Sequence, residues 1–274
     1  MAITNSCGQT IIQYNTQTGD AGNNLFNVSP GTAGQVLTSN GPSAQPTYQT
    51  AGIPVTTPVF VQDDFVGVVP MQLGTFISSL GWTGPSSSEC WRLISSTSYE
   101  SGHPGCISAK PATIFTNYYV SSLGLYAPGS GTITVTFVFK INTLSTGTNQ
   151  YFFAFGLGDP LRSVAPDNGL IFYYVNNQNS GKWIIKSSKA ASVTSVNTTT
   201  TVTTGWHNAQ IVINSAGTSA EFFMDGASQG TIATNIPVVG IGAGMNIYVN
   251  AGFFSSDVIV FDYFSLGIAL TNTR

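Results

Sequence analysis

The 274-residue chain is predicted to be an all-β protein whose main part is a β-sandwich. In residues 131–141, GTITVTFVFKI, apolar side chains recur at every second position, which is typical of a strand with one buried face. Similar short runs follow, separated by Gly, Asn, Asp, Ser and Pro, which favour tight turns. Many short strands and almost no helical periodicity favour a sandwich or barrel of about 200 residues.

The composition excludes two classes of partner. Only 7% of the residues are charged and the net charge is −3, whereas about 25% of residues are charged in a typical soluble domain. The eight Lys and Arg residues are spread thinly, so the basic surface that neutralises phosphates is missing and no nucleic-acid partner is expected. No run approaches the ~18 apolar residues of a membrane span, so none is expected.

The first 17 residues, MAITNSCGQTIIQYNTQ, lack the basic and apolar regions of a secretory signal. We therefore expect synthesis in a host cytoplasm. The low charge and the many hydroxyl and amide side chains are nonetheless typical of a protein built for the outside. Together the two observations fit a protein that leaves its cell by lysis.

Composition divides the chain into residues 1–57 and residues 58–274. Asp20 is the only charged residue of the first segment, and its apolar pieces are too short to build a core. Such a segment either remains a plain linker or becomes ordered against another chain. An uncharged segment can pack against copies of itself without burying ions. We therefore predict an extended, turn-rich oligomerisation or attachment segment before the sandwich.

Cys90 and Cys106 lie sixteen positions apart, and Gly102–Gly105 between them can turn the chain back. A disulfide between them would stabilise the fold by about 3 kcal/mol. Two reduced cysteines fit a protein made in a cytoplasm equally well. His103 and His207 lie far apart without zinc-ligand spacing. We expect no metal and no cofactor.

The stretch GWHNAQIVINSAGTSAEFFMDGASQGTIATNIP, residues 205–237, opens a strand with Gly-Trp-His and ends the next strand with Asp-Gly. It resembles the concanavalin A-like (laminin-G-like) jelly-roll group. QDDFVG and DVIVFDYFSL resemble the opening and closing strands of that group, which pair side by side. The resemblance implies a concanavalin A-like jelly-roll sandwich over residues 58–274. It also implies that Trp206 is a core residue and that Asp225–Gly226 form a turn.

The stretch PGTAGQVLTSNGPSAQPTYQT, near the N-terminus, resembles a segment that recurs in tailed-phage fibre and virion-surface proteins. The matching positions are Gly34, Gln35, Val36, Leu37, Pro46 and Tyr48. In such proteins the N-terminal part anchors the molecule to the virion or to sister chains, and the C-terminal domain faces outward. The resemblance implies a tail fibre, head fibre or capsid decoration protein on the virion surface. It also implies a homotrimer that contacts other virion proteins.

The jelly-roll group also contains glycoside hydrolases, which need two carboxylates about 5 to 9 Å apart. Its retaining hydrolases carry them as Glu-x-Asp-x-x-Glu on one strand, and that spacing is missing from this sequence. The adjacent Asp63 and Asp64 would point to opposite faces of a strand. We therefore expect no enzymatic activity.

The stretch PDNGLIFYY resembles a segment of legume-type lectins in which an Asp before a strand holds a sugar hydroxyl. The resemblance implies that Asp167 and Asn168 bind a host-surface glycan. Asp-Asn-Gly is also a favoured turn sequence. Tyr173 and Trp183 are candidate aromatic side chains for stacking on sugar rings. The lectins' metal motif, Asp-x-aromatic-x-Asn, is missing.

Two alternative functions remain open at this point. One is a secreted carbohydrate-binding module or glycan-active enzyme, which would carry a signal peptide and, for catalysis, paired carboxylates. The other is a bacterial surface adhesin or filament subunit, which would carry an export signal.

Overall fold

The structure is a computed structural model. It describes residues 59–65, 100–103, 105–109, 127–129, 131–159, 166–252, 254 and 256–270, together with the backbones of strands at 2–4, 10–12, 35–38, 47–50, 91–94 and 117–121. The chain divides into two compact units, Met1–Pro54 and Val55–Arg274.

The first unit contains two short antiparallel pairs. Strand β1 (Ala2–Thr4) pairs with β2 (Thr10–Ile12), and β3 (Gln35–Thr38) pairs with β4 (Thr47–Thr50). Four of the six predicted attachment residues therefore lie in one hairpin, in which Leu37 is opposite Tyr48. Gly34 and Pro46, the other two, lie outside the described residues.

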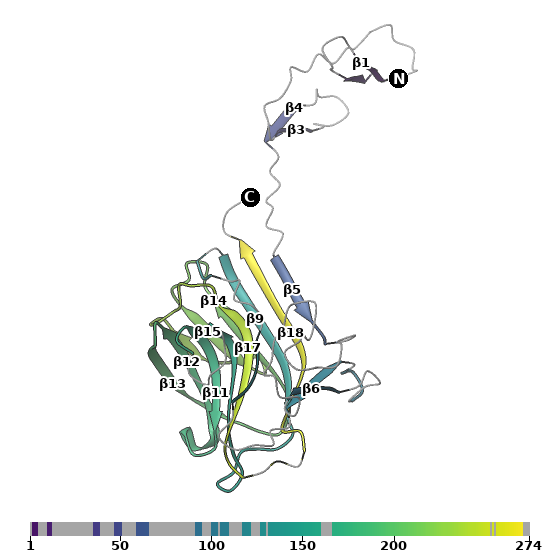
Figure 1. Cartoon of the computed structure of the whole chain (residues 1–274). Helices are drawn as coiled ribbons and strands as arrows, with labels where there is room; N and C mark the ends of the chain where they lie inside the picture. The colour runs from purple at the N-terminus through teal and green to yellow at the C-terminus, as the bar shows by residue number, and fades with distance from the viewer. Residues whose placement is uncertain are drawn as a thin grey trace. The chain divides into compact units, whose positions relative to one another are not determined.

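The second unit consists of two antiparallel sheets (Figure 1). The six-stranded sheet has the order β13 (Ser192–Thr201), β12 (Lys182–Lys189), β11 (Gly169–Val175), β10 (Gln150–Gly158), β17 (Gly242–Ala251) and β8 (Asn117–Ser121). The eight-stranded sheet has the order β16 (Ala227–Ile232), β15 (Ala220–Met224), β14 (Gly205–Ile213), β9 (Gly131–Ile141), β18 (Ile259–Leu270), β7 (Cys106–Ala109) and β6 (Trp91–Ile94), and β5 (Val59–Asp63) pairs with β18. A 3-10 turn, η1 (Asn179–Gly181), precedes β12.

Strand β9 shows the predicted alternation, because buried and partly buried residues alternate along its whole length. It lies beside β18 over almost its whole length. The predicted pairing of the opening and closing strands is confirmed, since β5 runs antiparallel to β18 with Asp63 opposite Phe264. Asp63 is buried and Asp64 is exposed, so the two carboxylates lie on opposite faces as expected.

The core lies between the sheets and is rich in aromatic rings. Phe139, from the eight-stranded sheet, packs against Phe155 and Trp183 from the six-stranded sheet, with centroid distances of 4.7 and 6.0 Å. Each fully buried side chain of this size stabilises the fold by roughly 1.5–3 kcal/mol. This core holds the two sheets together.

The structure corrects the expectation for Trp206. Its indole is half-buried on the face of β14 opposite the core, whereas the next residue, His207, points inward and is buried. Alternate residues of a strand face opposite sides, so only one of the two can enter the core. The predicted turn at Asp225–Gly226 is confirmed: these residues connect β15 to β16 with φ values of 52° and 78°, which a two-residue hairpin turn requires.

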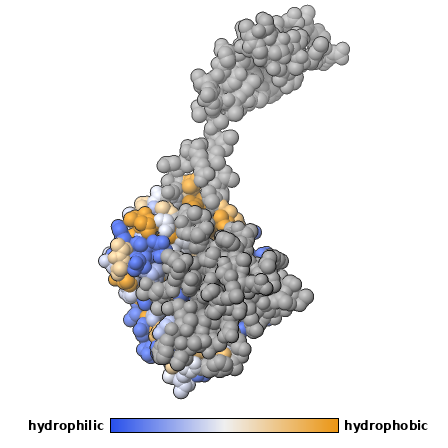
Figure 2. All heavy atoms as spheres, in the orientation of Figure 1, coloured by the Kyte–Doolittle hydropathy of each residue, from blue (hydrophilic) through white to orange (hydrophobic). Residues whose placement is uncertain are grey.

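Together these features make the second unit a concanavalin A-like jelly-roll β-sandwich, as predicted. In Figure 2, hydrophilic and hydrophobic residues are interspersed over the described part of the visible surface. Among the described residues, no helix has the length and apolar character needed to cross a membrane.

Candidate functional site

The face of the six-stranded sheet that points away from the core, called the outer face below, is also apolar. A second cluster of buried residues lies there: Ala154, Ile171, Tyr173, Val175 and Ile184, with Phe152 packed against them. Antiparallel sheets commonly present polar side chains on the face opposite the core. These five residues are 0–5% exposed and are therefore covered within the protein, whereas Phe152 is partly exposed at the border of the cluster.

Three aromatic rings form a row across the outer face. Tyr248 of β17 is directly opposite Phe152 of β10, and their rings are parallel within 2° at a centroid distance of 5.5 Å. Phe152 in turn stacks with Tyr173 of β11 at 6.4 Å and 24°. Tyr248 and Phe152 are half-buried, whereas Tyr173 is 5% exposed. The row thus runs from a solvent-accessible end to a buried end.

Lys186 of β12 lies at the buried end of the row. Its Nζ is 3.4 Å from the centre of the Tyr173 ring, a cation–π contact. Burial lowers the pKa of Lys186 to about 8 and raises the pKa of Tyr173 to about 12. None of the ion pairs among the described residues includes Lys186. The ammonium group is thus partly desolvated with an aromatic ring as its neighbour.

Asn246 of β17 adds an unpartnered amide to the same face. It is opposite Ala154, which is itself opposite Tyr173, so the three residues share one row of the sheet. The Asn246 side chain is 0% exposed, and neither its Oδ1 nor its Nδ2 has a hydrogen-bond partner among the residues that the structure describes. A buried polar group without a partner costs about 1–3 kcal/mol. Such groups in native proteins call for an explanation, and an ordered water is one.

The charged residues in the strands of the six-stranded sheet are all basic. Its six strands contain no Asp or Glu, and all three of their basic residues, Lys182, Lys186 and Lys189, lie in β12. The whole chain has a net charge of −3. This sheet is therefore basic in an otherwise acidic protein.

The four predicted ligand residues are not brought together. Asn168 Oδ1 accepts a hydrogen bond from the Ala190 backbone N–H at 3.0 Å, and the Asp167 carbonyl accepts one from the Ala191 N–H at 2.9 Å. Both contacts brace the turn between β12 and β13, as the turn interpretation of Asp-Asn-Gly requires. Tyr173 lies five residues after Asn168 along β11. Because a strand rises by about 3.3 Å per residue, Tyr173 is well separated from this turn.

Trp183 requires a correction. Its side chain is 0% exposed in the core between the sheets, so its indole has no surface on which a sugar ring could stack. Tyr173, ten residues earlier, has the opposite orientation and is the one predicted ligand residue on the outer face.

Sequence reasoning missed Phe152, Lys186, Asn246 and Tyr248. One signal was present: β10 and β11 read QYFFAFGLG and GLIFYYV, runs that are apolar at successive positions. Such runs indicate a strand buried on both faces. This pattern identifies strands that are buried on both faces. It does not show which residues of neighbouring strands lie opposite one another.

A cluster of polar and aromatic side chains lies on the face of the eight-stranded sheet that points away from the core. The His103 ring stacks on Trp206 at 3.6 Å and 7°, and its Nδ1 lies 2.7 Å from Asp262 Oδ2. Trp206 Nε1 donates to Glu100 Oε2 at 2.7 Å, and Glu100 also pairs with Lys140. The hydrogen bonds from Lys140 and Trp206 lower the pKa of Glu100. These contacts fasten the turn before β7 to the sheet.

Cys106 borders this cluster as a free, buried thiol, so of the two alternatives for Cys90 and Cys106 the structure has the reduced state rather than the disulfide. Its Sγ lies 3.7 Å from Asp262 Oδ1, a contact that places the thiol against a carboxylate instead of a second sulfur. Burial, followed by the charge of Asp262, raises the pKa of Cys106 to about 12. A protonated thiol is a poor nucleophile. Cys90 lies outside the described residues.

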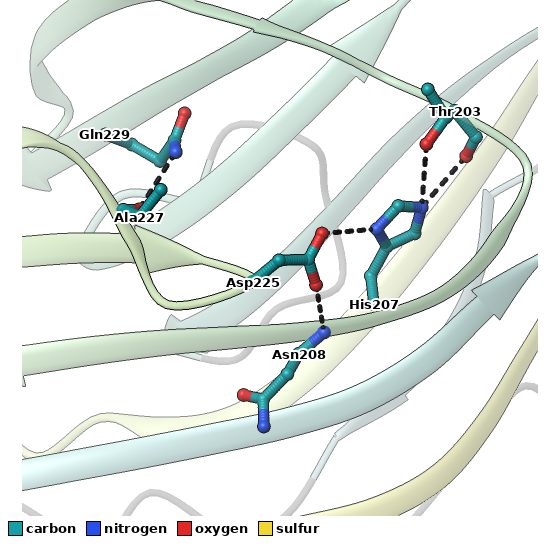
Figure 3. A network of polar contacts seen from close by, with 6 residues as sticks. All are labelled: Thr203, His207, Asn208, Asp225, Ala227 and Gln229. Atoms are coloured by element: carbon teal, nitrogen blue, oxygen red, sulfur yellow. Dashed lines mark hydrogen bonds and ion pairs between the residues drawn. The ribbon is translucent and has the colours of Figure 1, made fainter.

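A third network closes the end of the sandwich at β14 and β15 (Figure 3). The imidazole of His207 lies between Asp225 Oδ2, 2.8 Å from Nδ1, and the Thr203 carbonyl oxygen, 3.0 Å from Nε2. Asp225 Oδ1 also accepts a hydrogen bond from the Asn208 backbone N–H at 2.8 Å. Figure 3 shows Asp225 reaching from its turn toward both groups. Because His207 is buried and held on both sides, we interpret the network as structural.

Among the described residues, no group of three or more His, Cys, Asp or Glu side chains could hold a metal ion. The outer face of the six-stranded sheet is therefore the strongest candidate site. It combines an aromatic row that is partly exposed at one end with a partly desolvated cation, and apolar surfaces with a few polar groups are typical of binding sites.

Comparison with known proteins supports the fold. Neither a protein-family model nor a curated protein matches the sequence. A protein of unknown function, SO2946 from Shewanella oneidensis MR-1, is 14% identical, with a TM-score of 0.51 over 79% of this chain and 89% of that one. Weaker structural neighbours are the carbohydrate recognition domain of Emp47p, at 8% identity, TM-score 0.48 and coverage of 76% and 97%, and peanut lectin, at 10%, 0.48, 79% and 99%. At such identities the likeness concerns the fold alone.

Proposed function

We propose that the sandwich is a non-catalytic glycan-binding domain and that its ligand lies on the outer face of the six-stranded sheet. The observation that carries this proposal is the stacked pair of Tyr248 and Phe152, which are partly exposed, at the solvent end of the row that continues to Tyr173. The C–H faces of a pyranose ring pack on aromatic side chains.

The absence of catalysis is part of the same proposal. Glycoside hydrolysis needs an acid and a second carboxylate beside the scissile bond, and the six strands of this sheet carry neither Asp nor Glu. The one described thiol, Cys106, belongs to the other sheet and is held protonated. The groups on the outer face can bind and orient a sugar, and the carboxylate pair that glycoside hydrolysis needs is missing from the strands of this sheet.

The test is a glycan array followed by calorimetric titration of the full chain. We expect Tyr248→Ala to weaken binding by at least about tenfold, because truncation of an aromatic anchor commonly costs more than 1–2 kcal/mol. Phe60→Ala is the matched control, since Phe60 is a 57% exposed aromatic residue of the other sheet. Binding that Tyr248→Ala leaves unchanged, or no binding to any glycan, would overturn the proposal.

For the whole chain we further propose a role on a virion surface, as a tail fibre, head fibre or decoration protein. The specific observation is the β3–β4 hairpin, which pairs the sequence segments that resemble phage fibre proteins. A two-stranded hairpin alone is marginally stable, so association with other copies, as a trimer, or with other virion proteins would stabilise it.

This second proposal predicts that the full chain is a trimer and that a chain lacking residues 1–54 is a monomer with unchanged glycan binding. The sandwich has its own core, so the truncated chain is expected to fold. Light scattering at micromolar concentration measures both masses. A monomeric full chain, or a truncated chain that still assembles, would count against the attachment role, and electron microscopy of labelled particles tests the location directly.

A further inference from the structure

We infer that the glycan bound by the outer face is acidic and that a sugar carboxylate pairs with Lys186, which is partly exposed. This inference rests on the proposed glycan-binding function and names the class of ligand. It assigns a role to a lysine that the aromatic row alone leaves without a purpose.

The charge distribution is the first support. The six strands carry three lysines and no carboxylate, although the chain as a whole is acidic. Among the described residues, the contact of the Lys186 ammonium is the ring of Tyr173, and no carboxylate pairs with it. A desolvated cation without a counter-ion attracts an anion more strongly than an exposed one does. A carboxylate ligand would supply the missing partner.

The position of Lys186 is the second support. Its ammonium group lies over Tyr173, whose ring stacks with Phe152, and Phe152 stacks with Tyr248. Lys186, Phe152 and Tyr248 are partly exposed. A sugar packed on the rings of Phe152 and Tyr248 can therefore direct an acidic substituent toward the lysine end of the row.

The protonation of Lys186 gives the inference a pH signature. Burial places the pKa of Lys186 at about 8 in the free protein. A carboxylate that needs the ammonium form should bind well below this pH and lose affinity above it, by up to about tenfold per pH unit. A neutral glycan held by the aromatic row should show no such dependence.

The experiment compares polygalacturonate, alginate and hyaluronate with the same polymers after reduction of their carboxyl groups to alcohols. The full chain is titrated with each by calorimetry, and dextran sulfate serves as a generic polyanion. We expect at least one polyuronate to bind at least about tenfold more tightly than its reduced form, since loss of a charge-assisted hydrogen bond has that effect. The difference should vanish in Lys186→Met and return in Lys186→Arg.

Lys189→Met is the matched control, because it removes the same charge from an exposed residue of the same strand. We expect it to change the affinity less than about twofold. Thermal unfolding of each variant shows that it is folded. Equal binding of dextran sulfate in wild type and Lys186→Met is the expected behaviour of a generic polyanion.

The outcomes separate the two proposals. If the reduced polymers or other neutral glycans bind and the polyuronates do not, or if Lys186→Met binds polyuronates as wild type does, the acidic ligand is wrong while glycan binding stands. If no glycan of either kind binds, both proposals fail. Affinity for a polyuronate that does not fall between about pH 7 and 9.5 would also overturn the role of Lys186.

Discussion

The ammonium group of Lys186 lies 3.4 Å from the centre of the Tyr173 ring, on the face of the sheet that points away from the core. Burial lowers the pKa of the lysine and raises that of the tyrosine. The pair is therefore a sensitive reporter of what occupies this face.

The stability of the protein should rise with pH through this lysine. Its pKa is about 8 in the folded chain, below the ordinary value of 10.5, so between these values the unfolded chain binds more protons and folding gains as pH increases. Urea unfolding of wild type and Lys186→Met from about pH 7 to 10 measures the effect. The difference in unfolding free energy, wild type minus variant, should rise over this range.

Taking that difference removes the opposing contribution of Cys106, which lies in the other sheet and whose raised pKa lowers stability in alkali. A difference that stays flat or falls with pH would show that Lys186 is not desolvated in the folded protein.

Replacement of Asn246 should separate stability from binding. Asn246→Leu removes a fully buried amide that lacks a partner, so we expect the free energy of unfolding to increase by about 1 kcal/mol. Glycan binding should be unchanged in the same variant, because the amide has no exposed surface. The exposed Asn197 of the same sheet provides the control, and Asn197→Leu should change stability by less than about 0.5 kcal/mol. Destabilisation by Asn246→Leu would indicate a structural partner for the amide.

Asp225 should be the most sensitive residue of the network in Figure 3. Asp225→Ala removes the acceptors for His207 and Asn208, and it places a β-carbon without a polar group at φ 52°. We expect a loss of about 2–3 kcal/mol in unfolding free energy. Asp225→Gly loses the same hydrogen bonds without the strain and should be about 1 kcal/mol more stable than the alanine variant. Equal stabilities of the two variants would contradict the backbone part of this account.

Cys106 should be unreactive in the folded protein. Its side chain is 1% exposed and its pKa is about 12, so N-ethylmaleimide at about pH 8 should leave it unmodified, whereas the chain unfolded in guanidinium should react fully. Peptide mapping by mass spectrometry measures both. The same maps without reductant should contain no Cys90–Cys106 peptide, and finding that linked peptide would restore the disulfide.

Local patterns in the sequence were sufficient to predict that the protein is built of β-strands joined by tight turns. Alternation in residues 131–141 fixed the buried face of β9, and Asp225–Gly226 has the side chains that a two-residue hairpin turn needs. The predictions for Trp206 and Trp183 were wrong for the same reason. An aromatic side chain fits either face of a strand, and only the neighbouring strands decide which face lies in the core.

The sequence by itself determined that this chain is built of antiparallel strands with little charge, because alternation and turn chemistry act between near neighbours. Tertiary structure alone decided the candidate site. Tyr248 meets Phe152 only because β17 inserts between β10 and β8, far from its place in the sequence. Strand order depends on packing across the whole core, and no local pattern encodes it.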